Sequence, residues 1–513
     1  MMNNRDITNE RDKTALVIGG SIAGMLAARV LSEQYSQVVV VERDIPPLEP
    51  MNRMGTPQAF HPHGILPRGS RILQRLFPGI IDYLLAHGAF FIQGGKPGVF
   101  VQSTPYGDVD YPLLERGAGV SRALLEWVLR RRLQVMTNIR FLTGQEATGL
   151  VFNSDHSRVS GVHLRERGKL NRQLTLEADL VIDASGSSSQ LVQWLQTAGY
   201  TVAEPERVKG KLGYTTGYYR LPARTSAQVG RILIAPQPSK GLPGAGLFPI
   251  ENNNYMACLF LAGGQEYPPI NVEGFERTFS QLSSPLIAEA LWGAELTTSL
   301  RGFRVPECIR QHYEQMERWP AGLLVMGDAF CYFDPIYGQG MSVAAMGAEV
   351  LEQCLQEQQM QPQDDFELRT LQRLQEQIEP AWWYSTVSDL HWPGVEYSGS
   401  LSMQGLTLAQ KCIALYLAKA VQAANTGERN MNLFSVYMMV NGLLISPRKI
   451  INAQTIEALL KEDHSKEGQR LREQIDELTQ GGQRSLEAVL DEIIPTFAHA
   501  FEAILTSPIS SHR

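Results

Sequence analysis

The chain has 513 residues, enough for two to four domains at about 100–200 residues each. Apolar residues make up 43% and charged residues 19%, which is typical of a globular protein and excludes a disordered or fibrous one. The 53 acidic residues outnumber the 46 lysines and arginines, for a net charge of −7. No basic surface of the kind that binds nucleic acid is therefore indicated.

Cysteines and apolar runs narrow the class further. The five cysteines are scattered without a CxxC pair, which argues against a disulfide framework and a zinc site. Residues 1–14 are polar and do not resemble a secretory signal. The apolar run Leu433–Ile445 has 13 residues, whereas a membrane helix needs about 20. We expect a cytoplasmic protein without a transmembrane segment.

Residues 13–42 predict a strand, a tight turn, a helix and a second strand. The apolar run Ala15–Ile18 leads into the sequence GGSIAG, and the helix-forming sequence MLAARVLSEQ follows. The valines Val38–Val41 form the second strand. This order is that of a dinucleotide-binding βαβ unit.

The turn of this unit departs from GxGxxG at one position. Gly19 and Gly24 hold the first and third positions, and Ser21 holds the second, where a small residue lets a pyrophosphate approach the backbone. Glu42 follows Gly19 by 23 residues, near the spacing at which an acidic residue binds a ribose 2′-hydroxyl. The unit therefore favours FAD or NAD over NADP.

Two later glycine clusters follow apolar strands. The first reads VIDASG over 181–186, and the second lies in GLLVMGDAFCYFDPIYGQGMSVAAMGAEVL over 322–351. Asp328 ends the second strand, where its carboxylate can accept hydrogen bonds from sugar hydroxyls. The helix predicted to begin near Met341 offers free backbone N–H groups and a positive dipole end, which suit an anionic partner.

In their order these motifs resemble the FAD-dependent monooxygenases of the aromatic hydroxylase fold. The resemblance is closest to the squalene-epoxidase-like and polyether-epoxidase-like branch. It runs over residues 15–350 through GGSIAG with Glu42–Arg43, MGTPQAFHPHGILPRGSRIL, VSRALLEWVL, ADLVIDASGSSSQLVQWL and RWPAGLLVMGDAFCYFDPIYGQGMSVAA. The halogenase signature WxWxIP of this superfamily is absent from the chain.

The resemblance implies an α/β fold, in which a Rossmann-like FAD-binding domain of GR2 type carries an inserted β-sheet substrate domain and a C-terminal helical region. We expect the discontinuous FAD-binding domain over 1–87, 116–204 and 301–395, the substrate domain over 88–115 and 205–300, and the helical region over 396–513. Strands are predicted at Leu212–Leu221, Arg231–Ala235, Ala245–Ile250 and Tyr255–Leu261, and helices at Ala409–Ala424, Asn432–Leu444, Ala453–Leu478 and Arg484–Leu505. The helical region either caps the pocket or contacts a membrane surface.

The resemblance also implies the cofactor contacts. They are Gly19, Ser21 and Gly24 at the pyrophosphate, Glu42 and Arg43 at the adenosine ribose, Arg122 at the phosphate or ribose, Ala147 at adenine, Asp183 with Gly186 at the pyrophosphate, Asp328 at the ribityl or ribose hydroxyls, and Gly340 and Met341 at the flavin pyrimidine. Two positions depart from the family pattern. Cys331 stands where a histidine is common, and the DG motif reads DASG, which leaves its role in nicotinamide use open.

His61 and His63 are the candidates near the chemistry. An HxH pair can bind a metal, but no third and fourth ligand stand at a recognisable spacing, so no metal is predicted. Either both histidines are satisfied loop residues, or one lies near flavin N5 or the substrate and shapes the pocket or relays a proton. Cys331 is predicted to be a packed residue without reactivity.

The implied activity is oxygen transfer by way of a flavin C4a-hydroperoxide. FAD is the expected cofactor, with NAD(P)H and O2 as co-substrates and a hydrophobic alkene or aromatic molecule as substrate. Pocket candidates are Tyr214, Tyr218, Phe248 and Trp382. An FAD-dependent reductase of the geranylgeranyl-reductase type and a non-catalytic flavin-binding protein are the alternatives. A partner reductase, a homodimer and the choice between NADH and NADPH stay open.

Overall fold

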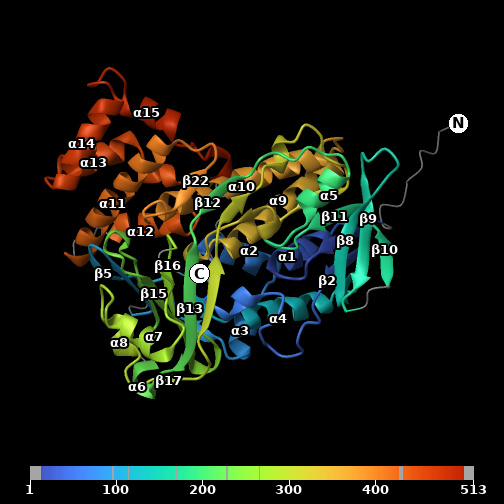
Figure 1. Cartoon of the computed structure of the whole chain (residues 1–513), viewed down its shortest axis with the longest axis horizontal. Coiled ribbons are helices and arrows are strands. Elements are labelled where there is room, and N and C mark those ends of the chain that lie inside the picture. Colours follow the sequence, from blue (N-terminus) through green and yellow to red (C-terminus); the bar gives the residue numbers. More distant parts are fainter. Residues whose placement is uncertain are drawn as a thin grey trace.

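A computed structural model describes residues 13–94, 98–113, 115–168, 172–226, 229–264, 266–426 and 431–501. It combines parallel and antiparallel sheets with helices, and the C-terminal helices lie at one end (Figure 1). The segment 1–12, where no secretory signal is expected, lies outside the described residues. Among the described helices, none combines the length and the apolar character that crossing a membrane requires.

A five-stranded parallel sheet forms the centre of the nucleotide-binding part. Its order is β20 (Leu323–Val325), β11 (Leu180–Asp183), β1 (Thr14–Ile18), β2 (Gln37–Glu42) and β7 (Ile139–Thr143). The four strands β20, β11, β1 and β2 are almost entirely buried and rich in valine, isoleucine and leucine because helices cover the sheet, whereas the edge strand β7 (IRFLT) is mostly half-buried. Helices α1 (Ile22–Leu31), α4 (Arg122–Gln134) and α10 (Phe366–Asp389) contact its strands. Helices α2 (Pro67–Leu76), α3 (Ile80–Ala86), α5 (Leu191–Thr197) and α9 (Gly340–Met360) contribute to the same hydrophobic core. The predicted strand–turn–helix–strand unit is confirmed.

A larger mixed sheet carries the strands predicted for the substrate part. Its order is β17 (Glu295–Leu296), β13 (Leu212–Arg220), β16 (Asn254–Leu261), β15 (Gly244–Pro249), β14 (Arg231–Ile234), β4 (Phe100–Thr104) and β5 (Gly107–Asp110), with β18 (Arg301–Val305) also paired to β13. Short helices α6 (Ala223–Ser226), α7 (Val272–Phe279) and α8 (Leu286–Ala290) lie beside it. All four predicted strands occur within one residue of their expected ends.

Three smaller sheets complete the strands. They are β8 (Gln145–Phe152), β9 (Val159–Glu166) and β10 (Gln173–Glu177); β21 (Cys331–Tyr332), β19 (Cys308–Arg310), β12 (Glu206–Lys209) and β22 (Glu396–Ser398); and β3 (Phe90–Ile92) with β6 (Gly117–Gly119). The β12–β22 pairing joins the start of the predicted substrate part to the start of the C-terminal region.

The C-terminal region is helical but more broken than predicted. It contains α11 (Met403–Asn425), α12 (Met431–Asn441), α13 (Ala453–Lys461), α14 (Lys466–Leu478) and α15 (Leu486–Ile493). The prediction of one helix over Ala453–Leu478 is wrong, because Ser465 accepts a hydrogen bond from the Gly468 N–H (3.0 Å) and starts a new helix. The helix predicted over Arg484–Leu505 is α15, which ends at Ile493, before Pro495. Residues 502–505 of the prediction lie outside the described ranges.

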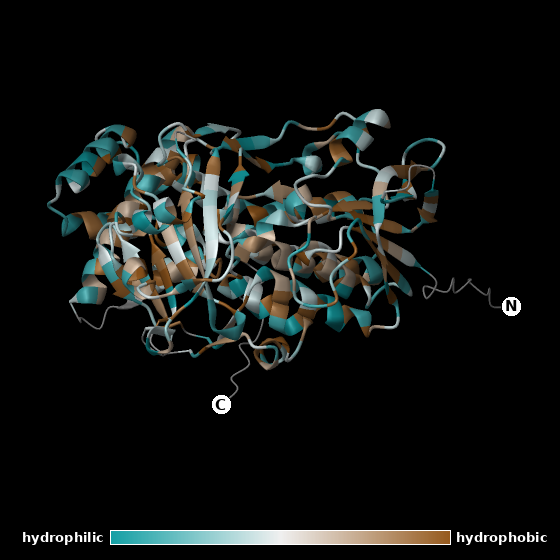
Figure 2. Cartoon of the chain, turned by 60° about the horizontal axis from the view of Figure 1, so that its bottom comes forward, coloured by the Kyte–Doolittle hydropathy of each residue, from teal (hydrophilic) through white to brown (hydrophobic). Residues whose placement is uncertain are grey.

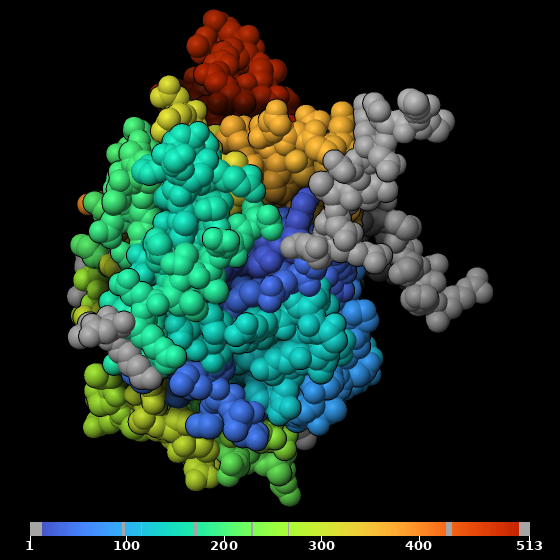
Figure 3. Space-filling model, turned by 90° about the vertical axis from the view of Figure 1, so that its right-hand side faces the viewer, coloured from blue at the N-terminus to red at the C-terminus, as the bar shows by residue number. Residues whose placement is uncertain are grey.

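These helices share a core with the large sheet. Phe100, Val109 and Tyr111, from β4 and the segment around β5, pack in one buried cluster with residues of α11 and α12. Hydrophobic residues are frequent on the inner strands and helices, whereas the outer helices carry many hydrophilic residues (Figure 2). The last helices project from the body of the molecule (Figure 3). The sheet and α11–α12 therefore form a single packed unit.

Candidate active site

A cavity of about 1370 Å³ extends from the β1–α1 turn to α11 and α12. This volume exceeds the roughly 300–1,000 Å³ of an ordinary small-molecule site, so it has room for a cofactor and a second molecule. Most of the predicted site residues line it, namely Gly19, Ser21, Glu42, Arg43, His61, His63, Arg122, Ala147, Asp328, Gly340 and Met341. Gly24 and Asp183 do not.

Two glycines permit the turn at one end of the cavity. Gly19 has φ +104°, and a Cβ there would overlap the carbonyl oxygen of Ala184. A Cβ on Gly24 would overlap the carbonyl oxygen of Gly19, so Gly24 lets α1 pack closely on β1 from behind the cavity. The free N–H groups of the first turn of α1 consequently face the cavity.

The Ser21 side chain joins this turn to α4. Ser21 is the N-cap of α1 but forms no capping bond with its side chain. Its hydroxyl accepts a hydrogen bond from Arg122 Nη2 (2.6 Å) and donates one to Glu126 Oε2 (3.1 Å). The serine at the second GxGxxG position therefore brings an arginine to the helix N-terminus.

Glu42 lies at the end of β2 and is buried. The N–H of Gly20 donates to its Oε2 (3.0 Å), and the N–H of Asp44 donates to its Oε1 (2.9 Å). Arg53 lies 3.2 Å from Oε1. The carboxylate is thus fixed at the cavity wall by its backbone donors, while the neighbouring Arg43 is exposed and donates to the Gly55 carbonyl (3.2 Å).

A buried charge cluster that the sequence analysis missed centres on Glu126. Its carboxylate accepts hydrogen bonds from Arg53 Nε (2.7 Å) and Arg130 Nη2 (2.8 Å) and lies 3.3 Å from Arg122 Nη2. Burial works to raise the pKa of Glu126, but the three arginines outweigh it and hold that pKa at about 2. Nε of Arg122 is buried without a partner among the described residues. The spacing of four residues between Arg122 and Glu126 could have indicated an ion pair on one helix face. No local pattern indicated that Arg53 joins this cluster.

Asp183 lies behind the cavity wall. Its carboxylate accepts hydrogen bonds from the N–H of Ser185 (2.9 Å) and the hydroxyl of Ser189 (2.5 Å), and it is fully buried at the end of β11. Ser185 and Gly186 line the cavity in its place. Asp183 therefore shapes the turn that presents these residues and makes no direct contribution to the lining.

Asp328 presents a carboxylate to the cavity. Burial raises its pKa to about 6, and Arg122 opposes that rise. No hydrogen bond to the carboxylate occurs within the part of the chain that the structure describes. An acceptor that lacks donors at a cavity wall suits a ligand with hydroxyl groups.

The N-terminus of α9 lies beside Asp328. Gly340 and Met341 begin the helix, and the N-cap Gln339 makes no capping bond with its side chain, whose Oε1 is buried without a described partner. The Ser342 hydroxyl accepts a hydrogen bond from the Leu66 N–H (2.7 Å). This bond fixes the histidine loop against the start of α9.

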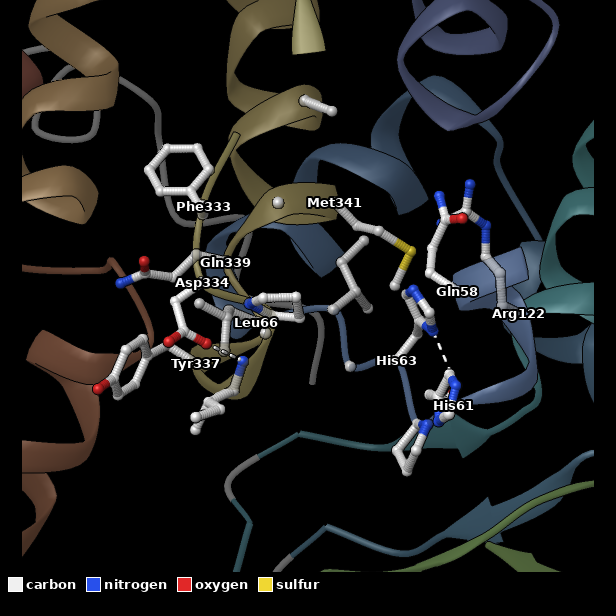
Figure 4. Close-up of a pocket in the computed structure, with 18 of the residues that line it drawn as sticks. Gln58, His61, His63, Leu66, Arg122, Phe333, Asp334, Tyr337, Gln339 and Met341 are labelled. Atoms are coloured by element: carbon white, nitrogen blue, oxygen red, sulfur yellow. Dashed lines mark hydrogen bonds between the residues drawn. The ribbon is translucent and has the colours of Figure 1, made fainter. Parts of the chain in front are cut away.

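The two histidines lie between α9 and Arg122, as Figure 4 shows. His63 Nδ1 lies 2.8 Å from the carbonyl oxygen of His61, which makes Nδ1 the donor and leaves Nε2 as an acceptor. His61 Nδ1 lies 2.9 Å from the Thr216 hydroxyl, and its ring contacts Tyr214 edge-on. Burial lowers the pKa of His61 to about 3 and that of His63 to about 4, so both are neutral at pH 7. No cluster of three potential metal ligands occurs within the described ranges.

Behind the α9 loop lies a buried pair of carboxyl groups. Asp334 and Asp389 share a hydrogen bond, and the Tyr337 hydroxyl donates to Asp389 (2.8 Å). Burial raises the pKa of Asp334 to about 6, and burial together with Asp334 raises the pKa of Asp389 well above its usual range. The pair therefore holds a proton near neutral pH.

The other end of the cavity is largely apolar. Tyr214 and Phe248 line it as predicted, but Tyr218 and Trp382 do not. Tyr218 stacks on Phe60 (4.6 Å between ring centroids), and the Trp382 indole N–H donates to the buried Glu206 (2.6 Å). Residues of α11 and α12 also line this end, namely Gln410, Ile413, Ala414, Leu417, Tyr437, Met438, Met439 and Asn441. The C-terminal region thus covers the pocket, one of its two expected roles.

Cys331 is packed in the core as expected. It is buried and unpaired, and burial raises its pKa far above the usual range of a thiol. The other four cysteines are likewise buried and free. None has the lowered pKa of a reactive thiol.

Comparison with known proteins identifies the family. The model of the FAD binding domain family matches residues 12–360. Protein Rv3254 of Mycobacterium tuberculosis is 29% identical over 399 residues, which cover 75% of this chain and 81% of that protein. Mouse squalene monooxygenase is 23% identical over 356 residues, or 67% of this chain and 55% of that enzyme. The myxobacterial chondrochloren halogenase CndH shares the fold, with a TM-score of 0.58 at 16% identity over 89% of this chain and 99% of its own.

These matches confirm the resemblance drawn from the motifs. FAD is the cofactor, and NAD(P)H is the co-substrate typical of the family. The protein has the aromatic hydroxylase fold and is a flavin-dependent oxidoreductase of the FAD-dependent monooxygenase class. Because the family model spans more than half of the chain, the protein belongs to the FAD binding domain family.

Proposed function

We propose that this enzyme uses NAD(P)H and O2 to epoxidise or hydroxylate a hydrophobic alkene or aromatic small molecule. The observation that carries the proposal is the continuity of the cavity, which joins the β1–α1 turn to the largely apolar end under α11 and α12. Bound FAD would supply hydride acceptance from NAD(P)H and activation of dioxygen. The similarity to squalene monooxygenase supports an apolar alkene as the substrate class.

The proposed cofactor contacts follow from groups that face the cavity without full partners. The N-terminus of α1 and Arg122, whose Nε has no described partner, would bind the pyrophosphate. The fixed carboxylate of Glu42 would accept a hydrogen bond from the adenosine ribose, with Arg43 beside it. The backbone of Ala147 would contact adenine.

The flavin end would be held by Asp328 and α9. Asp328 would accept hydrogen bonds from the ribityl or ribose hydroxyls, which would lower its raised pKa. The first turn of α9, at Gly340 and Met341, would stabilise negative charge on the pyrimidine edge. Gly24 and Asp183 would act only by shaping the turns that meet the cofactor.

His63 would be the residue nearest the chemistry. Its neutral ring presents Nε2 as an acceptor, which would hold a proton released at flavin N5 or at the substrate. His61 would keep that ring in place through its carbonyl oxygen and its bond to Thr216. The protein needs no nucleophile of its own, because the cofactor carries the oxygen chemistry.

The test uses purified protein with its visible flavin spectrum. NAD(P)H oxidation is screened against alkenes and aromatics under labelled dioxygen, and products are analysed by mass. Incorporation of one labelled oxygen atom would support the proposal. Addition of two hydrogens to an alkene would establish the reductase instead, and a flavin that NAD(P)H does not bleach with any substrate would argue for a partner reductase or for no catalysis.

A further inference from the structure

Arg231 lies in the wall of the apolar end of the cavity and has no acidic partner among the described residues. It begins β14, where side chains alternate between the two faces of the sheet: Ile232 packs in the core, whereas Arg231 and Leu233 line the cavity. Its Nε is buried without a hydrogen-bond partner among the described residues. Burial lowers the pKa of Arg231, and no acidic group in the described ranges offsets that effect.

Two phenyl rings flank this guanidinium. Its Cζ lies 5.9 Å from the ring centroid of Phe100, its register partner on β4, and 5.8 Å from that of Phe248. Cation–π contacts attract a cation but do not replace a counter-ion. Arg122, the buried arginine at the other end of the cavity, has Glu126 as its counter-ion. A half-buried cation whose Nε has no described partner is costly to leave unpaired, and its presence in a binding cavity points to a ligand of opposite charge.

We propose that Arg231 anchors an anionic group, such as a carboxylate or an ionised phenol, on an otherwise apolar substrate. The inference rests on the proposed function, since it names the substrate class of the same site. The planar guanidinium would bind a carboxylate through two parallel hydrogen bonds. Leu233 and the α11 residues Ile413 and Leu417 would contact the apolar body.

Two fluorescent dyes test the anion site on the FAD-saturated protein. The dyes 8-anilinonaphthalene-1-sulfonate and N-phenyl-1-naphthylamine share one apolar body, and only the first carries a negative charge. Arg231→Met is expected to weaken binding of the sulfonate dye about tenfold or more and to change that of the neutral dye by less than about twofold. Arg231→Lys, which keeps the charge but not the planar fork, is expected to retain part of the affinity.

Arg301→Met is the matched control. Arg301 lies over the Phe60 ring (4.9 Å) on β18 of the same sheet, is exposed and does not line the cavity. Its removal should leave both dyes unaffected. Unchanged sulfonate binding in Arg231→Met, or equal losses for both dyes, would overturn the inference, and Arg231→Gln decides the matter if the Met variant does not fold.

A second readout separates a binding role from a structural one. Because Arg231 has no described counter-ion, its replacement by methionine is expected to raise the thermal midpoint, whereas loss of a structural residue would lower it. Dye binding involves no turnover. Failure to incorporate oxygen would therefore refute the proposed function without affecting the inference of an anion site. Unchanged dye binding in Arg231→Met would refute the anion site without affecting the proposed function.

Discussion

Glu126→Gln tests the buried charge cluster on which the position of Arg122 depends. The substitution keeps the shape of the side chain but removes the negative charge that Arg53, Arg122 and Arg130 surround. Breaking a buried ion pair by neutralising one partner costs about 3–5 kcal/mol of stability. Independently, a pKa of about 2 in the fold against the ordinary 4.5 corresponds to about 3 kcal/mol at neutral pH, at about 1.4 kcal/mol per pH unit.

The pH dependence has a defined sign. The folded pKa of Glu126 is depressed, so its stabilisation is present above pH 4.5 and is lost as the pH falls toward 2. The free energy of unfolding is measured by urea titration of FAD-free protein, followed by tryptophan fluorescence. The difference between wild type and Glu126→Gln should be about 3 kcal/mol at pH 7, by the same linkage, and should shrink below pH 4.5.

Glu146→Gln supplies the control, because Glu146 forms a half-exposed pair with Arg165 (2.6 Å). Exposed pairs contribute about 0–1 kcal/mol, so this variant should unfold almost as the wild type does. Equal unfolding free energies for the two variants would refute the assignment of a strongly stabilising cluster around Glu126. So would a wild-type advantage over Glu126→Gln that does not change with pH.

The remaining predictions concern the turns, the cofactor and the carboxyl pair. Asp328→Ala should purify with little flavin, measured as visible absorbance relative to protein, and full occupancy with normal turnover would disprove its assignment. Gly24→Ala should lower the thermal midpoint strongly because its Cβ would overlap the Gly19 carbonyl, whereas Gly210→Ala, with open space at its Cβ, should not. The pKa of Asp389 is raised in the folded protein, so the protonated side chain contributes most stability below the ordinary pKa of an aspartate, and this contribution is lost as the pH rises through the folded pKa. Asp389→Asn should therefore have the same free energy of unfolding as the wild type in urea titrations at low pH and a higher one at high pH. A constant difference would show that Asp389 does not titrate in this way.

Local patterns were sufficient to predict the nucleotide-binding unit. The valine run Val38–Val41, the helix after GGSIAG and the glycines that allow the turn act within about 30 residues, so their signal is continuous in the sequence. The strands of the large sheet were predictable for the same reason, since Asn252–Asn254 mark the turn between β15 and β16. The helix breaks at Ser465 and Pro495 also carried local signals, which the longer helical periodicity obscured.

Contacts between distant segments were decided by the tertiary structure. Arg53 reaches Glu126 across 73 residues, and no local pattern marks a residue whose partner lies in another element. The apolar spacing of α11 does not reveal that Leu417 faces a cavity, because apolar residues pack against neighbouring elements and line ligand sites alike. The sequence by itself determined the fold class, the FAD-binding motifs and the flavoprotein chemistry, which depend on local geometry. The folded chain decided which charges are paired, that Arg231 has no described partner, and that the C-terminal helices cover the pocket, because burial and pairing depend on which surfaces meet.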